Sequence, residues 1–205
     1  MPWQRKRKNW EWATDSPTMV TAVLDACVLY PAPLRDFLLN LACSGIFRAR
    51  WSDEIHDEWI RNLLQNRSDL TAAQLRRTRE LMNKAVPDCL VGGYHGIAKS
   101  LILPDPDDTH VLAAAICCRA QVIVTFNVKD FPRESLAPYG IEAQHPDQFV
   151  RHFIALDSSA VCDAFERQRD SLKNPPQSAE RLLNTLERQG LVISVSELRP
   201  LVGGL

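Results

Sequence analysis

The sequence Val20-Thr21-Ala22-Val23-Leu24-Asp25 decides the fold, because a short apolar run ends there at a carboxylate. A run of this length is typical of a buried strand. Residues 121–125 form a second run of the same kind, and residues 141–143 could form a third strand. Helical signals separate these runs. Strand–helix–strand alternation with short connections predicts an α/β domain with a parallel sheet.

The segments between the predicted strands have clear helix signals. Residues 33–44 have apolar side chains at helical spacing. Ser52 can cap a second helix, and Thr71 with Gln74 forms a capping box that opens a third. Residues 111–118 are nearly all small and apolar, which predicts a well-buried helix.

The character of the sequence changes beyond residue 146, where it becomes all-helical. We predict helices over 146–156, 160–172 and 178–190, followed by a docked turn and strand. The domain organisation we expect is an accessory N-terminal extension, an α/β domain and a helical C-terminal extension. Their ranges are 1–18, 19–150 and 151–205.

The charge of the chain excludes one class of protein. Among 205 residues, 24 basic and 25 acidic side chains leave a formal net charge of -1. A protein that coats DNA needs a basic field, so near-neutrality argues against that role but permits local contact with nucleic acid. Residues 1–18 hold four basic and two acidic groups, whereas residues 19–150 hold 13 basic and 16 acidic. The acid excess therefore falls on the segment with the predicted strands.

Sequence signals for export, membrane insertion and metal-binding cysteines are weak. No apolar run approaches the roughly 18 residues that a membrane span needs, and no apolar segment follows the basic cluster at residues 5–8. We expect a cytoplasmic protein without a membrane segment. The six cysteines include no Cys-x-x-Cys and lie mostly in apolar stretches, which favours buried free thiols in a reducing compartment.

Four acidic side chains stand where apolar elements begin or end, or beside an apolar helix face: Asp25, Glu58, Asp108 and Asp130. In an open parallel sheet, ligands gather beyond the carboxyl ends of the strands, so Asp25 and Asp130 should be neighbours. Clustered carboxylates repel one another unless protons or cations compensate. Oxygen-only ligands favour Mg²⁺ or Mn²⁺ over zinc, which points to phosphoryl chemistry.

Each of these acids also has a structural interpretation. Asp107 and Asp108 could cap a helix, and Asp130 with Asn127 could form an ordinary Asx-type turn. Glu58 could be a solvated helix glutamate. The joint pattern, rather than any single acid, supports a site.

Four segments together resemble the motifs of PIN domains, in the family's order and spacing, over about residues 20–150. They are Leu24-Asp-Ala-Cys-Val-Leu-Tyr-Pro31, Ser52-Asp-Glu-Ile-His-Asp-Glu-Trp59, Asp105-Pro-Asp-Asp-Thr-His-Val-Leu-Ala-Ala-Ala115 and Val124-Thr-Phe-Asn-Val-Lys-Asp-Phe-Pro132. Within that family the chain looks like VapC-type toxins with a C-terminal helical extension. The resemblance implies a three-layer PIN-like fold, in which helices flank a short parallel sheet.

The resemblance also implies a catalytic metal site that holds one or two Mg²⁺ or Mn²⁺ ions. Its acidic ligands carry over to Asp25, Glu58, Asp108 and Asp130. Asp107 could share or replace the role of Asp108, and Glu54 could compete with Glu58 from one helical turn away. Thr125 and Asn127 match the family's supporting polar positions.

The function that the resemblance implies is hydrolysis of RNA phosphodiester bonds by a toxin paired with a small DNA-binding antitoxin. A homodimer is compatible with this role. The alternatives are an inactive PIN module that binds RNA or protein, and a housekeeping RNA-processing nuclease. A phosphatase is disfavoured, because Ala26 and Cys27 follow Asp25 in place of an Asp-x-Asp motif. No glycine-rich nucleotide motif occurs.

Basic side chains near the predicted acids are candidates for guiding RNA, or else form a solvated basic face. They are Arg61, Arg67, Arg76, Arg77, Arg79, Lys84 and Lys129. His110 lies on the predicted buried helix, where a core histidine is favoured over a catalytic one.

Overall fold

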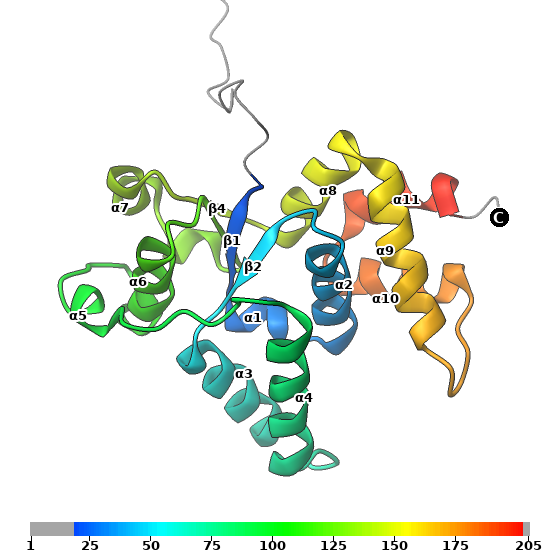
Figure 1. Ribbon diagram of the computed structural model, residues 1–205, viewed down its shortest axis with the longest axis horizontal. Helices are drawn as coiled ribbons and strands as arrows, with labels where there is room; N and C mark the ends of the chain where they lie inside the picture. Colours follow the sequence, from blue (N-terminus) through cyan, green and yellow to red (C-terminus); the bar gives the residue numbers. More distant parts are fainter. Residues whose placement is uncertain (1–18, 203–205) are drawn as a thin grey trace, which may run out of the picture.

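A single parallel sheet organises the computed structural model, which describes residues 19–202. The predicted N-terminal extension, residues 1–18, lies outside the described residues. The strand order is β2-β1-β3-β4 (Figure 1). The strands are β1 (Thr21–Leu24), β2 (Arg48–Arg50), β3 (Val122–Val124) and β4 (Glu142–Gln144). This arrangement confirms the α/β class and the three expected strands.

β2 is a strand that the sequence did not predict. Its three residues read Arg-Ala-Arg, and only Ala49 is buried. The signal was the alternation of Phe47, Ala49 and Trp51, all of which are buried. Arg48 and Arg50 alternate with these apolar residues and lie on the more exposed face of the strand. They interrupt the apolar run by which a buried strand is usually recognised, as is common in an edge strand with one solvated face.

Helices cover both faces of the sheet and extend below it in Figure 1. The N-terminal and central helices are α1 (Ala26–Leu29), α2 (Ala32–Cys43), α3 (Asp53–Asn66), α4 (Ala72–Ala85), α5 (His95–Ala98), α6 (Thr109–Cys117) and α7 (Arg133–Leu136). Three short 3₁₀ helices are η1 (Pro106–Asp108), η2 (Val128–Asp130) and η3 (Ala137–Tyr139). The C-terminal helices are α8 (Pro146–Leu156), α9 (Ser158–Ser171), α10 (Ala179–Arg188) and α11 (Val192–Val202). The sheet lies between α6 on one side and α2 with the C-terminal helices on the other.

The predicted helix caps are confirmed. Ser52 Oγ accepts the N–H of Ile55 at 3.2 Å and so begins α3. The Thr71 hydroxyl accepts the N–H of Gln74, whose side chain accepts the N–H of Thr71 in return. This reciprocal pair satisfies two donors that would otherwise be exposed at the start of α4. Among residues 19–202, no helix is both long and apolar enough to cross a membrane.

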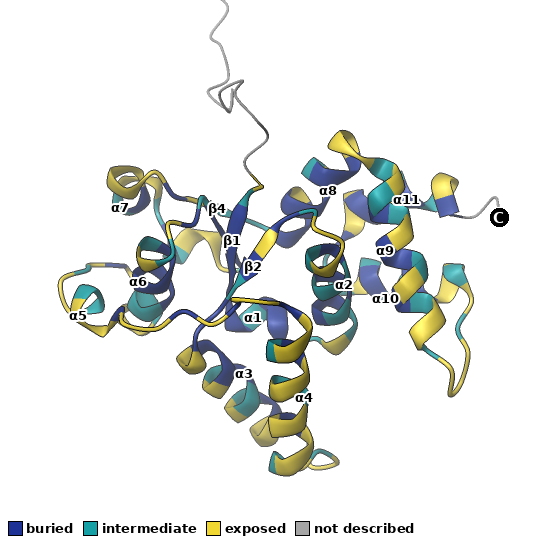
Figure 2. Cartoon of the chain, viewed as in Figure 1, coloured by how far each residue is buried: buried dark blue, intermediate teal, exposed yellow. Residues whose placement is uncertain are grey.

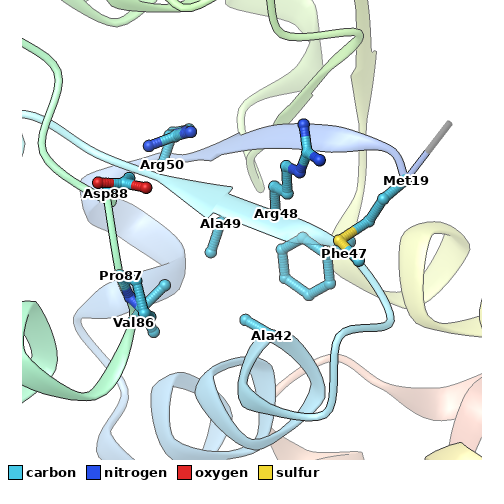
Figure 3. A pocket seen from close by; sticks show the side chains of 9 residues that line it. All are labelled: Met19, Ala42, Phe47, Arg48, Ala49, Arg50, Val86, Pro87 and Asp88. Carbon is cyan, nitrogen blue, oxygen red and sulfur yellow. The ribbon is translucent and has the colours of Figure 1, made fainter.

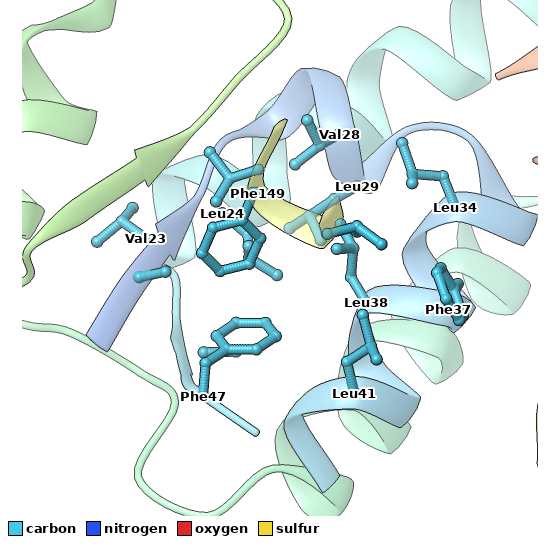
Figure 4. Close-up of a cluster of buried hydrophobic side chains, with 14 of the residues drawn as sticks. Val23, Leu24, Val28, Leu29, Leu34, Phe37, Leu38, Leu41, Phe47 and Phe149 are labelled. Carbon is cyan, nitrogen blue, oxygen red and sulfur yellow. The ribbon is translucent and has the colours of Figure 1, made fainter. Parts of the chain in front are cut away.

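The hydrophobic core runs without a break from the sheet into the C-terminal helices. Side chains of β1, α1 and α2 pack together with Phe47 and Phe149 (Figure 4). The rings of Phe47 and Phe149 meet edge to face, with centroids 4.9 Å apart, so α8 packs against the residue that leads into β2. Phe37 of α2 meets Phe165 of α9 in the same way. Figure 2 shows the buried faces of these helices turned toward this shared core.

The C-terminal helices also complete the start of α2. No side chain of its own segment caps α2, which begins with Ala-Pro. Instead, the Gln189 side chain accepts the N–H of Leu34 at 2.8 Å. The Gln168 side chain donates to the carbonyl of Pro33 at 2.8 Å. Because the first turn of a helix leaves N–H groups without partners, the Gln189 side chain replaces a local cap, and the Gln168 side chain ties α9 to the same turn.

The predicted turn and strand after residue 191 is wrong, because that segment forms helix α11. The carboxylate of Asp147, on α8, accepts the N–H groups of Ile193 at 2.9 Å and Ser194 at 2.8 Å. Asp147 is only 8% exposed. It acts as the cap of α11 from 46 residues away, so the local sequence carried no capping signal.

We predict that Asp147→Ala destabilises the protein strongly. It leaves two N–H groups at a buried helix start without an acceptor, which should lower the free energy of unfolding by about 2–4 kcal/mol. Urea denaturation followed by circular dichroism measures this change. Asp163→Ala removes the same charge from an exposed position on α9 and should change stability by less than about 0.5 kcal/mol. Equal stability of the two variants would contradict the proposed cap.

Candidate active site

Asp25 is the buried centre of the site. It follows the last residue of β1 and caps α1, where its Oδ1 accepts the N–H of Ala26 at 2.6 Å. The hydroxyl of Thr125, just beyond β3, donates to Asp25 Oδ2 at 2.7 Å. Only 3% of Asp25 is exposed. Burial raises the pKa of Asp25, the bond from Thr125 opposes that rise, and the charge of Glu58 adds to it.

Thr125 connects the two central strands at their carboxyl ends. It is fully buried, and besides donating to Asp25 it accepts the N–H of Asn127 at 3.0 Å. The parallel pairing of Leu24 with Val124 brings these residues together. Thr125 therefore stands where a supporting residue was expected. Asn127 takes part in this contact through its backbone N–H.

Asp108 does not act as a helix cap through its side chain. It occupies the N-cap position of α6 but makes no capping bond, and Asp105 caps η1 through the N–H of Asp107 at 2.9 Å. The pKa of Asp108 is raised to about 7. The cause is first burial, then the charges of Asp25, Asp105, Glu58 and Asp130. Asp108 therefore lies within the field of the three other predicted acids.

Asp107 and Asp130 differ in their surroundings. Asp107 is exposed, whereas Asp130 is partly buried at the end of η2. The N–H of Asp130 donates to the carbonyl of Asn127 at 2.9 Å. The turn is thus held by backbone, and the Asn127 side chain does not cap it. An Asx-type turn does not explain Asp130.

The two glutamates of α3 face His110 on α6. His110 Nε2 lies 3.5 Å from Glu58 Oε2, and its Nδ1 lies 3.7 Å from Glu54 Oε2. The Glu58 side chain is 29% exposed and that of Glu54 45%, so Glu58 is the inner of the two. Glu54 Oε1 also lies 3.3 Å from His95 Nδ1 at the rim.

The prediction that His110 is a core histidine is wrong. Its side chain is 17% exposed and lies beside the carboxylates of Glu54 and Glu58. Burial alone would lower the pKa of His110, but the hydrogen bond and charge of Glu58, with the charges of Glu54 and Asp25, raise it above the usual value. Its position one residue after Thr109, on the first turn of α6, places it at the acidic edge of the sheet.

Cys27 is a further residue of the site that the sequence treated only as a buried thiol. Its Sγ lies 3.1 Å from Asp25 Oδ2 and 3.4 Å from Thr125 Oγ1. It also accepts the N–H of Phe126 at 3.2 Å. Burial raises the pKa of the thiol. Its position two residues after Asp25 was the available signal, because α1 starts between them and turns Cys27 back toward the carboxylate.

The acidic group fits a hard divalent cation in donor type and charge. Its ligands would be Asp25, Glu58, Asp108 and Asp130. All their donors are carboxylate oxygens, which suit Mg²⁺ or Mn²⁺. Burial and the charges of the neighbouring acids raise the pKa of Asp108. Across residues 19–202, no three His, Cys, Asp or Glu side chains already converge as a ready-made metal site. Ion binding would thus have to draw the carboxylates together.

The basic candidates divide into paired and exposed groups. Arg79 donates to Asp53 at 2.6 Å and to Asp57 at 2.9 Å, which ties α4 to α3. Arg67 pairs with Asp69, and Arg77 with Glu80. Among the predicted basic candidates, all of which lie in the described part of the chain, four are exposed and have no carboxylate within 4 Å. They are Arg61, Arg76, Lys84 and Lys129.

A separate hollow of about 410 Å³ lies against the outer edge of β2 (Figure 3). Arg48 and Arg50 project on one side of the strand, and Phe47 and Ala49 lie toward α2. None of the four predicted acids lines this hollow. The acidic group and the basic edge of the sheet are therefore different places on the molecule.

Comparison with known proteins identifies the family of the chain. The family model described as "PIN domain" matches residues 21–129. This chain belongs to the PIN domain family. The match includes Asp25, Glu58 and Asp108, and it ends one residue before Asp130. The model "VapC50 C-terminal domain" matches residues 146–200, which comprise most of α8 to α11.

One curated relative shares part of this PIN domain chain. The protein named "Putative ribonuclease VapC50", from Mycobacterium tuberculosis (strain ATCC 25618 / H37Rv), is 43% identical over 82 residues. That alignment covers 40% of this chain and 48% of the relative, so it spans about half the length of that protein. No solved structure gives a significant match.

We predict that Asp108→Asn stabilises the metal-free protein at pH 8. A carboxyl whose folded pKa is about 7, against 3.8 for the ordinary group, progressively destabilises the fold as the pH rises from about 4 to about 7. Removing the charge should raise the free energy of unfolding by about 1–3 kcal/mol at pH 8, allowing for solvent screening. The gain should vanish near pH 4. Urea denaturation in EDTA at both pH values measures it, and equal stability of Asp108→Asn and wild type at pH 8 would contradict the raised pKa.

Proposed function

We propose that this protein is a metal-dependent endoribonuclease and the toxin of a toxin–antitoxin pair. The observation that carries the proposal is the gathering of carboxylates around Asp108, whose pKa is about 7 because of burial and of the charges of Asp25, Glu58 and Asp130. Carboxylates that repel one another lower the stability of the fold, and proteins commonly keep such groups where function requires them. Membership of the PIN family and the name of the relative support a ribonuclease.

The acidic side chains would hold one or two Mg²⁺ or Mn²⁺ ions. When bound, such ions activate a water and offset the charge that develops on the attacking and leaving oxygens of a phosphodiester. Asp25, Glu58, Asp108 and Asp130 would bind and orient the ions. Asp107 remains an alternative to Asp108, and Glu54 to Glu58, although both alternatives are the more exposed residue of the pair.

Neighbouring residues would keep these ligands in place. Thr125 donates to Asp25 Oδ2 and fixes the carboxylate on the inner side of the site. His110 Nε2 stands 3.5 Å from Glu58 Oε2 and orients the second ligand. Metal ligands commonly depend on partners of this kind for their orientation.

The substrate and partners follow from charge and from the family. RNA would be guided by exposed cations around the acidic group, with Arg61, Arg76, Lys84 and Lys129 the candidates that lack a carboxylate partner in the described chain. Arg77 and Arg79 are engaged in ion pairs and are weaker candidates. A small DNA-binding antitoxin would cover the acidic site, and a cytoplasmic location and a homodimer are compatible with this role.

We predict that the purified chain cleaves RNA only with Mg²⁺ or Mn²⁺. EDTA should abolish cleavage, and Asp25→Asn or Asp108→Asn should reduce kcat/KM at least about 100-fold, because each removes a charged ligand. Gel analysis of a labelled RNA measures this. Asp163→Asn, an exposed acid on α9, should retain wild-type activity. Binding of RNA without cleavage would instead support an inactive PIN module.

We predict that expression of the chain alone slows bacterial growth, whereas expression of Asp25→Ala does not. The reason is that cleavage of cellular RNA needs the buried ligand. Growth curves measure the effect, and sequencing of RNA ends after a brief pulse of expression identifies the target. Equal growth of the two strains, combined with cleavage in vitro, would favour a housekeeping nuclease.

A further inference from the structure

Three donors fix the carboxylate of Asp25. Its Oδ1 accepts the N–H of Ala26 at 2.6 Å, and its Oδ2 accepts the hydroxyl of Thr125 at 2.7 Å. The third donor is Cys27, whose Sγ lies 3.1 Å from the same Oδ2. The N–H of Phe126 donates to Cys27 Sγ at 3.2 Å, so the sulfur accepts on one side and donates on the other.

The ring of Phe126 is held by the C-terminal helices. It meets His145 edge to face, with ring centroids 5.1 Å apart. It also lies against Gly190, in the turn between α10 and α11. A Cβ added at Gly190 would stand 2.9 Å from Phe126 Cε1 and 3.7 Å from His145 Cε1. A side chain at residue 190 would therefore press on the ring of Phe126, whose backbone N–H contacts Cys27.

We propose that Cys27 is a positioning residue for the Asp25 carboxylate, and that the Gly190 turn keeps Cys27 in place through Phe126. The relay joins the segment that matches the VapC50 C-terminal domain to the acidic group of the PIN domain. It rests on the proposed function in one respect, namely that Asp25 binds a metal ion. The C-terminal helices would thereby influence the orientation of Asp25 indirectly, through the contact of Gly190 with Phe126 and of Phe126 with Cys27.

The physical basis is the restriction of a rotamer. An aspartate that binds a metal must hold one carboxylate orientation, and outer partners that fix it commonly contribute 10- to 100-fold in metal affinity. Thr125 and Cys27 restrain the same oxygen from different elements, since Thr125 follows β3 and Cys27 lies on α1. Loss of Cys27 leaves Oδ2 with a single donor.

Titration of the full chain with Mn²⁺ by calorimetry tests the role of Cys27. Cys27→Ala should bind Mn²⁺ about 10-fold more weakly than wild type, and Cys27→Ser, which can still donate and accept, should recover most of that loss. Cys162→Ala removes a half-buried thiol from α9 and should bind as wild type does. Equal affinity of Cys27→Ala and wild type would overturn the proposal. A wild-type protein that binds no Mn²⁺ would instead overturn the proposed function.

A second pair of variants tests the link to the C-terminal helices and does not require Cys27→Ala to fold. Gly190 and Gly140 both have positive φ, +97° and +67°, so alanine is strained at either position. A Cβ at Gly140 would meet nothing within 4 Å. Gly190→Ala should weaken Mn²⁺ binding several-fold and lower kcat, whereas Gly140→Ala should leave the Mn²⁺ affinity unchanged. Equal affinities in the two variants would show that the Phe126 ring turns aside without moving Cys27, and would overturn the link.

Discussion

The hydrogen bond from Thr125 to Asp25 is the contact on which the site depends. It joins residues 100 positions apart, at the carboxyl ends of β1 and β3. A carboxylate that is 3% exposed is unfavourable unless it is hydrogen-bonded. The donors exist only because parallel pairing places Thr125 beside Asp25 and because α1 starts at Ala26. The register of β1 against β3 therefore decides whether Asp25 can be buried at this position.

Stability and chemistry oppose each other around this contact. Burial, together with the gathering of acids that would bind a cation, raises the pKa of Asp108 to about 7. The fold compensates elsewhere, through a core that continues from the sheet into α8 and α9. Proteins commonly keep such unfavourable groups only where function requires them. His110 lies beside Glu54 and Glu58 and, when it is protonated, offsets part of the repulsion on the α3 side of the group.

The C-terminal helices are part of this balance rather than a separate appendage. Gln189 caps the start of α2, Gln168 donates to the carbonyl of Pro33 in its first turn, and the rings of Phe149 and Phe165 extend the core of the PIN domain. The turn at Gly190 packs against Phe126, one residue from Thr125. The two segments that different family models match therefore share one hydrophobic core. They also contact each other close to the acidic group, where Gly190 meets Phe126.

The sequence by itself determined the class of the fold and most of its long helices, and it singled out the acids of the candidate site. Apolar runs at 20–24 and 121–125 specify strands locally, and Ser52 and Thr71 cap helices within four residues, so neither needs the tertiary structure to be recognised. What only the tertiary structure decided were the roles that depend on distant partners. α11 is capped by Asp147 from another helix, β2 is a strand because it pairs with β1, and His110 faces two glutamates of α3. Cys27 contacts Thr125 across 98 residues. Hydrogen bonds and ion pairs form between groups a few ångströms apart in space. Partners that are far apart along the chain therefore cannot be recognised from a local sequence pattern.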